Sequence, residues 1–213
     1  MYLSKTPPIL KAVASHLTWN GPRTRDGVPA IYLTFDDGPH PEVTREVMRI
    51  LARYRAPATF FCVGQNLERY PEVAIELRAA GHAIGNHLHQ HESGWETPTW
   101  SYLRSYVRCR ELVGDGRWFR PPYGRISRQQ AEALQGHTRI VMWDVLSGDW
   151  DATQSPDDCF NRLRTHTRPG AIVVFHDSER AAPRMLATLP RYLDWLADEG
   201  YGCFPFPGEH EEW

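Results

Sequence analysis

Short apolar runs alternate along the chain with longer segments of helical periodicity. The apolar runs at residues 31–35 and 171–175 are continuous and rich in β-branched and aromatic residues, which is typical of strands buried on both faces. The predicted strands cover residues 31–35, 58–63, 82–86, 118–119, 139–145, 171–175 and 201–204, and the predicted helices cover residues 42–54, 71–80, 99–113, 127–134, 155–166 and 183–199. This succession of about seven βα units predicts an α/β fold with a parallel sheet.

Two α/β architectures satisfy this alternation, a doubly wound open sheet and a (β/α) barrel. No GxGxxG sequence follows the first predicted strand, which disfavours a dinucleotide-binding open sheet. Polar residues follow several of the predicted strands, and in a barrel such residues gather just beyond the C-terminal strand ends. These residues are Asp36, Asp37, His87, His91, Arg120, Asp149, His176 and Asp177. We therefore expect a distorted (β/α)7-type barrel with one site at that end.

The chain divides into one large domain and two short flanking segments. Residues 30–205 contain no linker or low-complexity tract and are predicted to form the barrel, with residues 1–29 as an N-terminal extension and 206–213 as a C-terminal tail. Apolar residues in the extension repeat at helical spacing, at Leu10, Val13, Ala14 and Leu17. They predict a short amphipathic helix, which we interpret as packing on the domain; attachment to a membrane surface is the alternative.

The N-terminal segment is also relevant to the cellular location of the protein. A secretory signal needs roughly 7–15 consecutive apolar residues, and a transmembrane helix needs about 20. Pro7, Pro8, Lys11 and His16 interrupt any such run near the N-terminus, and no apolar run elsewhere reaches the second length. We expect neither a signal peptide nor a transmembrane segment, and the sequence leaves open the cytoplasm, a membrane periphery and export.

Charge and cysteine content exclude several classes of protein. The chain has 24 Lys+Arg against 26 Asp+Glu, a net charge of −2, and so lacks the basic excess of a nucleic-acid-binding protein. Its four cysteines stand far apart without a CxxC pair, which argues against a zinc knuckle and a disulfide framework. Aromatic residues make up 12% of the chain, which suits a well-filled core or a carbohydrate cleft. We expect a monomer.

Two of the strand ends carry a candidate metal site. Asp36 and Asp37 are adjacent, and because strand side chains alternate in direction, one carboxylate can bind a metal while the other faces the substrate. His87 and His91 are four residues apart, which on a helical turn places both imidazoles on one side. Two histidines and one carboxylate make a zinc-type ligand set with an open position. His89 is expected to point elsewhere, at the rim. A solvated acidic turn and a solvated histidine-rich loop are the alternatives.

Two further strand ends carry candidate acid–base and positioning groups. His176 follows an apolar strand and titrates near neutral pH, which makes it a candidate proton donor. Arg120 opens a loop that Pro121 and Pro122 make rigid, and its guanidinium can hold a carboxylate through two parallel hydrogen bonds. The structural alternatives are a histidine bonded to its neighbour and an ordinary salt bridge.

Five motifs, in this order and at these intervals, resemble those of one family. TFDDG at 34–38, the His87–His91 pair, RPPYG at 120–124, GDW at 148–150 and FHD at 175–177 look like the motifs of the polysaccharide deacetylases, the NodB homology domain of carbohydrate esterase family 4. The resemblance covers residues 30–205. It implies a NodB-like barrel and a hydrolase that removes N-acetyl groups from N-acetylglucosamine-type residues of a polysaccharide or oligosaccharide. The implied partner is an N-acetylated glycan, and the implied cofactor is a divalent metal, zinc or alternatively cobalt.

The resemblance also implies the reacting residues. Asp37, His87 and His91 are similar to the family's metal ligands. Asp36 matches the general base that acts on metal-activated water. His176 matches the acid that protonates the departing amine.

Supporting roles follow from the same resemblance. Arg120 matches the residue that orients the base, and Asp149 matches the one that holds and tunes His176. The backbone amide of Tyr123 corresponds to the donor that stabilises the tetrahedral oxyanion. Trp150 and Val174 stand at the family's aromatic and aliphatic positions, which wall the pocket for the acetyl methyl group.

Two departures from the family pattern leave questions open. Leu88 replaces the hydroxyl residue that usually follows the first histidine, and Leu146 replaces the first Asp of the usual Asp-x-x-Asp-Trp motif. The loop Glu92–Trp100 carries Trp95 and Trp100, which either contact substrate or belong to the core. Alternatives to the deacetylase are an acetyl-ester (xylan-type) esterase, another C–N hydrolase on the same fold and a non-catalytic glycan-binding protein.

Overall fold

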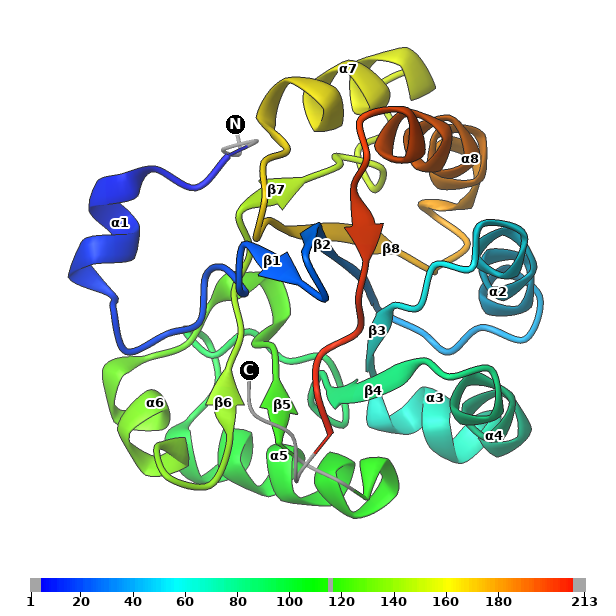
Figure 1. The fold of residues 1–213 in the computed structure, drawn as a ribbon. Coiled ribbons are helices and arrows are strands. Elements are labelled where there is room, and N and C mark those ends of the chain that lie inside the picture. The colour runs from blue at the N-terminus through cyan, green and yellow to red at the C-terminus, as the bar shows by residue number, and fades with distance from the viewer. Residues whose placement is uncertain (1–4, 115–116, 209–213) are drawn as a thin grey trace.

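The computed structural model describes residues 5–114 and 117–208, which form a curled parallel sheet surrounded by helices (Figure 1). The sheet order is β6-β5-β4-β3-β2-β8-β7, and β1 and β9 pair with β2. The strands are β1 (Thr24–Arg25), β2 (Val28–Asp36), β3 (Thr59–Cys62), β4 (Ala83–Asn86), β5 (Trp118–Phe119), β6 (Arg139–Ile140), β7 (Val145–Leu146), β8 (Ile172–His176) and β9 (Gly202–Cys203). All pairings along the seven-stranded path are parallel, which confirms the predicted distorted α/β barrel.

Helices surround this sheet, and all of them except α1 lie against its outer side (Figure 1). They are α1 (Pro8–Val13), α2 (Val43–Tyr54), α3 (Gly64–Arg69), α4 (Pro71–Ala79), α5 (Thr99–Val113), α6 (Arg128–Leu134), α7 (Pro156–His166) and α8 (Ala182–Asp198), with a 3₁₀ turn η1 at Pro122–Gly124. Within the described part of the chain, none has the length and apolar character required to span a membrane.

The alternation of side chains along β2 separates the outer core from the barrel interior. Ile31, Leu33 and Phe35 belong to the large core cluster that the sheet shares with α2 and α8. Ala30 and Tyr32, between them, belong to a second cluster with side chains of β3, β5 and β8. Because the strand period is two, the interior side of β2 continues with Thr34 and ends at Asp36. The sequence pattern therefore delivers the Asp36 carboxylate to the C-terminal mouth of the barrel.

One predicted strand is divided in the structure, and one helix forms that the sequence did not predict. The run 139–145 is not one strand, because Arg139 and Ile140 pair with β5, whereas Val145 begins β7, which pairs with β8. Between these halves the backbone amide of Met142 donates to the carbonyl of Thr18, so the N-terminal segment takes over part of the pairing. The helix α3 was not predicted; it ends at Arg69, and Tyr70, whose φ of −133° is not helical, separates it from Pro71, the first residue of α4.

The N-terminal segment runs along β6 and β7, the two ends of the sheet. The Thr18 amide donates to the Ile140 carbonyl at 2.8 Å, and the Thr6 amide donates to the Asp144 carbonyl at 3.0 Å. Lys11 forms an ion pair with the buried carboxylate of Asp144. The helix α1 itself stands off the barrel (Figure 1), so the expected packing on the domain is wrong for Leu10 and Val13, which is 78% exposed. Leu17, beyond the end of α1, does pack on the domain, against a buried cluster that contains Leu88 and Phe119.

Candidate active site

The mouth of the barrel holds a cavity of about 480 Å³. Of the ten residues predicted from the sequence, eight line it: Asp36, Asp37, His87, His91, Tyr123, Trp150, Val174 and His176. The other two lie directly behind it, Arg120 in contact with Asp36 and Asp149 in contact with His176. All of the predicted site residues therefore come together in one place.

Asp36 is held by a fully buried arginine. Nη1 of Arg120 donates to Oδ1 of Asp36 at 2.7 Å and to Oγ1 of Thr34 at 2.7 Å, and Nη2 donates to the carbonyl of Met142 at 3.0 Å. The guanidinium carbon lies 4.2 Å from the centroid of the Phe61 ring. A buried arginine with several fixed partners cannot change its position easily, so one oxygen of Asp36 is fixed in the cavity wall.

Three ligand atoms converge beside Asp36. A carboxylate oxygen of Asp37 and one ring nitrogen each of His87 and His91 lie within 4.8 Å of one another. Nε2 of His91 is 3.1 Å from Oδ1 of Asp37, and Nε2 of His87 is 3.7 Å from the same oxygen. One carboxylate oxygen and two imidazole nitrogens are the donor set of many zinc sites, so these residues fit a divalent metal.

Neighbouring groups fix the orientation of these ligands. Nδ1 of His87 lies 2.7 Å from the carbonyl of Arg120, and donation to that carbonyl leaves the Nε2 lone pair facing Asp37. Burial lowers the pKa of His87 to about 4, so its ring is neutral at pH 7. Burial alone would raise the pKa of Asp37, but the hydrogen bond to His91 and the charge of His176 lower it below its usual range. Both groups are therefore in the protonation state that a metal ligand needs.

Left-handed backbone conformations occur at this site in residues other than glycine. Asp37 has a φ of 79°, and His91 and Tyr123 each have a φ of 59°. Such conformations are uncommon outside glycine and persist only where surrounding contacts stabilise them. At Asp37 one such contact is the side-chain amide of Asn66, which donates to the Asp37 carbonyl at 2.7 Å. The three side chains are aimed into the cavity at the cost of backbone strain.

His89 lies on the other side of the ligand loop, as its position between His87 and His91 predicts. Its ring faces Glu68, with Nε2 3.7 Å from Oε2, and contacts the backbone of Gly64. The expectation that it sits at the rim is wrong, because the side chain is buried. The packing of α3 against this loop, which the sequence did not predict, covers it.

The Leu88 departure has a structural explanation. Its side chain is fully buried in an apolar cluster with Tyr102, Tyr106 and Phe119. Two other side chains stabilise the loop in place of a hydroxyl at position 88. Oδ1 of Asn86 accepts from the Leu88 amide at 2.8 Å, and the hydroxyl of Ser105 accepts from the His89 amide.

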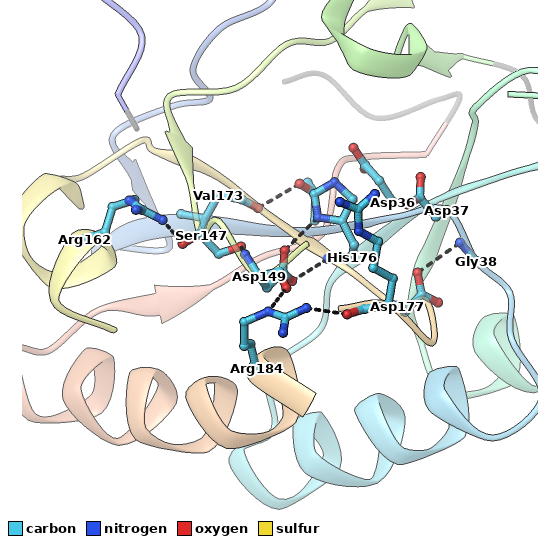
Figure 2. Close-up of polar contacts among 12 residues, drawn as sticks. Asp36, Asp37, Gly38, Ser147, Asp149, Arg162, Val173, His176, Asp177 and Arg184 are labelled. Carbon is cyan, nitrogen blue, oxygen red and sulfur yellow. Dashed lines mark hydrogen bonds and ion pairs between the residues drawn. The ribbon is translucent and has the colours of Figure 1, made fainter. Parts of the chain in front are cut away.

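His176 and Asp149 form the second half of the site (Figure 2). The two oxygens of Asp149 accept hydrogen bonds from His176, one from Nδ1 and one from the backbone amide, each at 2.8 Å. Burial alone would lower the pKa of His176, but the charge and hydrogen bond of Asp149 raise it to about 9. Nδ1 is thus engaged, and the ring presents Nε2 to the cavity. Asp36 and His176 are register partners on β2 and β8 and hence direct neighbours.

Asp177 braces the turn that carries Asp37. The sequence placed it at the strand end but gave it no role. Its buried carboxylate accepts from the Gly38 amide at 3.2 Å (Figure 2). It also accepts from the Thr44 hydroxyl. Burial raises the pKa of Asp177 to about 7. The side chain connects the end of β8 to the Asp36–Gly38 turn and to the first turn of α2.

This brace predicts the effect of Gly38→Ala. A Cβ at this position would lie 2.1 Å from Oδ2 of Asp177, so the turn or the carboxylate must move. We expect the free energy of unfolding to fall by about 1–3 kcal/mol, as for other overpacked sites, and the zinc affinity of the Asp37 loop to fall with it. Urea unfolding and titration against a chelator measure both. Gly208→Ala, where the added Cβ meets nothing, is the matched control, and equal results for the two variants would contradict the role of Asp177.

The remaining cavity wall contains residues that the sequence did not single out as site residues. They are Pro121, Arg125, Trp143, Leu146, Ser178 and Arg180. Leu146 adds an apolar side chain beside Trp150 and Val174, and the Trp150 ring stands edge-on to His176 with the centroids 4.8 Å apart. Trp143 packs on Gly124. Leu146 belongs to β7, and the other five come from loops whose positions the strand pattern does not specify.

A family model described as polysaccharide deacetylase matches residues 23–138, more than half of the chain. Among curated proteins, a chitooligosaccharide deacetylase of Azorhizobium caulinodans is 38% identical over 198 residues, covering 84% of this chain and 93% of that protein. A peptidoglycan-N-acetylglucosamine deacetylase of Bacillus cereus is 30% identical over 193 residues, covering 87% and 89% of the two chains.

A solved structure of a deacetylase is also similar to this chain. The crystal structure of the peptidoglycan N-acetylglucosamine deacetylase Bc1960, in complex with 4-naphthalen-1-yl-N-oxidanyl-benzamide, superposes with a TM-score of 0.85. The two chains are 26% identical, and the similarity covers 95% of each.

Proposed function

Because the chain belongs to the polysaccharide deacetylase family, we propose that it hydrolyses the acetamide of N-acetylglucosamine residues in an oligosaccharide or polysaccharide. The products are acetate and the free amine of the sugar. The similar proteins named as chitooligosaccharide and peptidoglycan N-acetylglucosamine deacetylases support this substrate class. The observation that carries the proposal is the convergence of the Asp37, His87 and His91 ligand atoms with Asp36 and His176 in one cavity.

Asp37, His87 and His91 are the proposed ligands of a divalent cation, zinc or alternatively cobalt. Their nitrogen and oxygen donors suit zinc, and three protein ligands leave a position open for water or substrate. When bound, such a cation polarises the acetyl carbonyl and lowers the pKa of water.

Asp36 is the proposed general base. Its carboxylate lies next to the ligand set but outside it, and Arg120 holds one of its oxygens. The second oxygen can accept a proton from the attacking water, which forms the bond to the acetyl carbon. The guanidinium of Arg120 keeps the carboxylate oriented while its charge changes.

His176 is the proposed general acid. Amide cleavage expels a poor leaving group, so the nitrogen must receive a proton as the C–N bond breaks. The raised pKa of about 9 keeps His176 protonated at neutral pH, and Asp149 fixes the ring through Nδ1. Nε2, which faces the cavity, supplies the proton.

The remaining wall residues are proposed to position the acetyl group. Trp150, Leu146 and Val174 offer an apolar surface for the methyl. The backbone amide of Tyr123, a residue of the cavity wall, is the proposed donor of a hydrogen bond that stabilises the oxyanion.

The role of Asp149 predicts a shifted pH profile for Asp149→Asn. A general acid must be protonated, so kcat/KM falls as the pH rises through its pKa. Removing the Asp149 charge leaves burial as the dominant influence and lowers the pKa of His176 from about 9. The alkaline limb of the profile is therefore expected to move to lower pH. Rates from pH 5 to pH 10 test this, and an unmoved alkaline limb would argue that another group is the acid.

Acetate release tests the proposed function. The purified protein is incubated in the presence of zinc with each of three substrates in turn. These are N-acetylglucosamine oligomers, peptidoglycan and acetylxylan. We expect acetate and free amine in equal amounts from an N-acetylated glycan, and loss of both on addition of EDTA. Release from acetylxylan alone would identify an esterase, and no release from any substrate would refute the proposal.

A further inference from the structure

The chain that follows β9 runs across one end of the barrel (Figure 1). The backbone amide of Phe206 donates to Oγ1 of Thr59, the first residue of β3, at 2.9 Å. Nε1 of Trp118, the first residue of β5, donates to the carbonyl of Pro207 at 2.8 Å. The segment that carries Phe206 is therefore attached at the N-terminal ends of the strands, whereas the candidate active site lies at their C-terminal ends.

The side chain of Phe206 fills the interior of the barrel at this end. It is 2% exposed, and its ring centroid lies 4.9 Å from that of Trp118 and 5.9 Å from those of Tyr32 and Phe61. All four residues belong to the interior cluster on which β2, β3, β5 and β8 converge. Removal of the Phe206 ring would therefore leave a void among closely packed side chains.

Phe61 connects this interior cluster to the candidate active site. The guanidinium carbon of Arg120 lies 4.2 Å from the centroid of the Phe61 ring. A Cβ on Gly85 would lie 2.6 Å from Cδ1 of Phe61, so the backbone of β4 lies directly against the same ring. Nε of Arg120 has no hydrogen-bond partner among the residues that the structure describes. The orientation of the guanidinium therefore depends on the contacts of its two Nη groups and on the Phe61 ring.

We infer that Phe206 is a positioning residue for the proposed general base. It supports the Phe61 ring from the base of the barrel, the ring supports the guanidinium of Arg120, and the guanidinium holds Asp36. A void at position 206 lets the Phe61 ring tilt, and a displacement of about 1 Å at a reacting group can cost about 10²-fold in rate. This inference rests on the proposed function and adds to it a residue at the opposite end of the barrel from the cavity.

The test compares kcat with KM in matched variants. Acetate release from the β-1,4-linked N-acetylglucosamine tetrasaccharide is measured at saturating zinc for the wild type, Phe206→Ala, Phe206→Leu and Leu77→Ala. Leu77 is fully buried in the outer core on α4, so Leu77→Ala is the control for a general loss of stability. We expect Phe206→Ala to lower kcat about tenfold and to leave KM and zinc affinity within about twofold of the wild type. Phe206→Leu, which refills most of the void, should recover most of kcat, and Leu77→Ala should keep the wild-type kcat.

The NMR signal of the Arg120 side chain gives a readout that does not depend on turnover. Its Nε–H resonance, assigned by triple-resonance experiments, is shifted by the ring current of Phe61, on which the guanidinium lies. We expect this resonance to move in Phe206→Ala, to move less in Phe206→Leu and to stay in place in Leu77→Ala. If Phe206→Ala does not fold, Phe206→Leu gives the same two measurements with smaller changes.

Several results would overturn the inference. They are an unchanged kcat in Phe206→Ala, an equal loss of kcat in Leu77→Ala, a fall in zinc affinity as large as the fall in kcat, and an unmoved Arg120 resonance. Absence of acetate release by the wild type would refute the proposed function. In that case an Arg120 resonance that follows the Phe206 variants would still support the positioning of Arg120 and Asp36, and an unmoved resonance would overturn it.

Discussion

Asp36→Asn is expected to lower kcat for acetate release by about 10²–10⁴-fold while the amount of bound metal stays unchanged. Asparagine has the size of aspartate and keeps an oxygen that can accept from Arg120, but it carries no charge with which to take a proton. Asp36 lies outside the converging ligand atoms of Asp37, His87 and His91, so its replacement leaves those three in place. Acetate release and elemental analysis on the same preparation measure both effects.

Asp37→Ala is the control for this result. It removes the carboxylate on which both histidines converge, so metal content and activity should fall together, and excess zinc should restore part of the rate. Added zinc should not rescue Asp36→Asn. If Asp36→Asn lost its metal while Asp37→Ala retained it, the two adjacent carboxylates would have the opposite roles.

His176→Ala is expected to slow amide hydrolysis by about 10²–10³-fold and to have a much smaller effect on an activated aryl acetate. The amine leaves only if it is protonated, whereas a phenolate leaves without a proton. His176 presents Nε2 to the cavity while Asp149 engages Nδ1, so the variant removes the donor from the wall next to Asp36. Rates on a chitooligosaccharide and on an aryl acetate give the comparison.

A loss of equal size on both substrates would contradict the acid role. In that case His176 would act before the leaving group departs, for example by shaping the cavity with Trp150. His137→Ala, an exposed histidine distant in sequence from every site residue, should leave both rates unchanged.

The sequence predicted the positions of the chemistry because parallel strands bring their C-terminal ends together. Asp36 and His176 end adjacent strands, and the alternation of side chains along a strand predicted that Asp36 and Asp37 leave it in different directions. The motif spacing also predicted that His89 would point away from His87 and His91. These are consequences of strand and turn periodicity, which a single chain displays directly.

Contacts between distant segments were not predictable in the same way. The division of residues 139–145 depends on backbone pairing with Thr18, and the burial of His89 depends on α3. The brace from Asp177 to Gly38 and the stacking of Arg125 on Trp95 join loops that no local pattern relates. The side chain of Trp143 likewise reaches the cavity only through the tertiary path of its loop.

The most direct test of the metal assignment is the anomalous difference map of crystals grown with zinc. One peak is expected, about 2.0–2.3 Å from an oxygen of Asp37 and from Nε2 of His87 and His91. Asp36 should lie beside this peak without coordinating it, still bonded to Arg120. A peak coordinated by His89 or Asp36 in place of these ligands, or no peak in the cavity, would contradict the assignment.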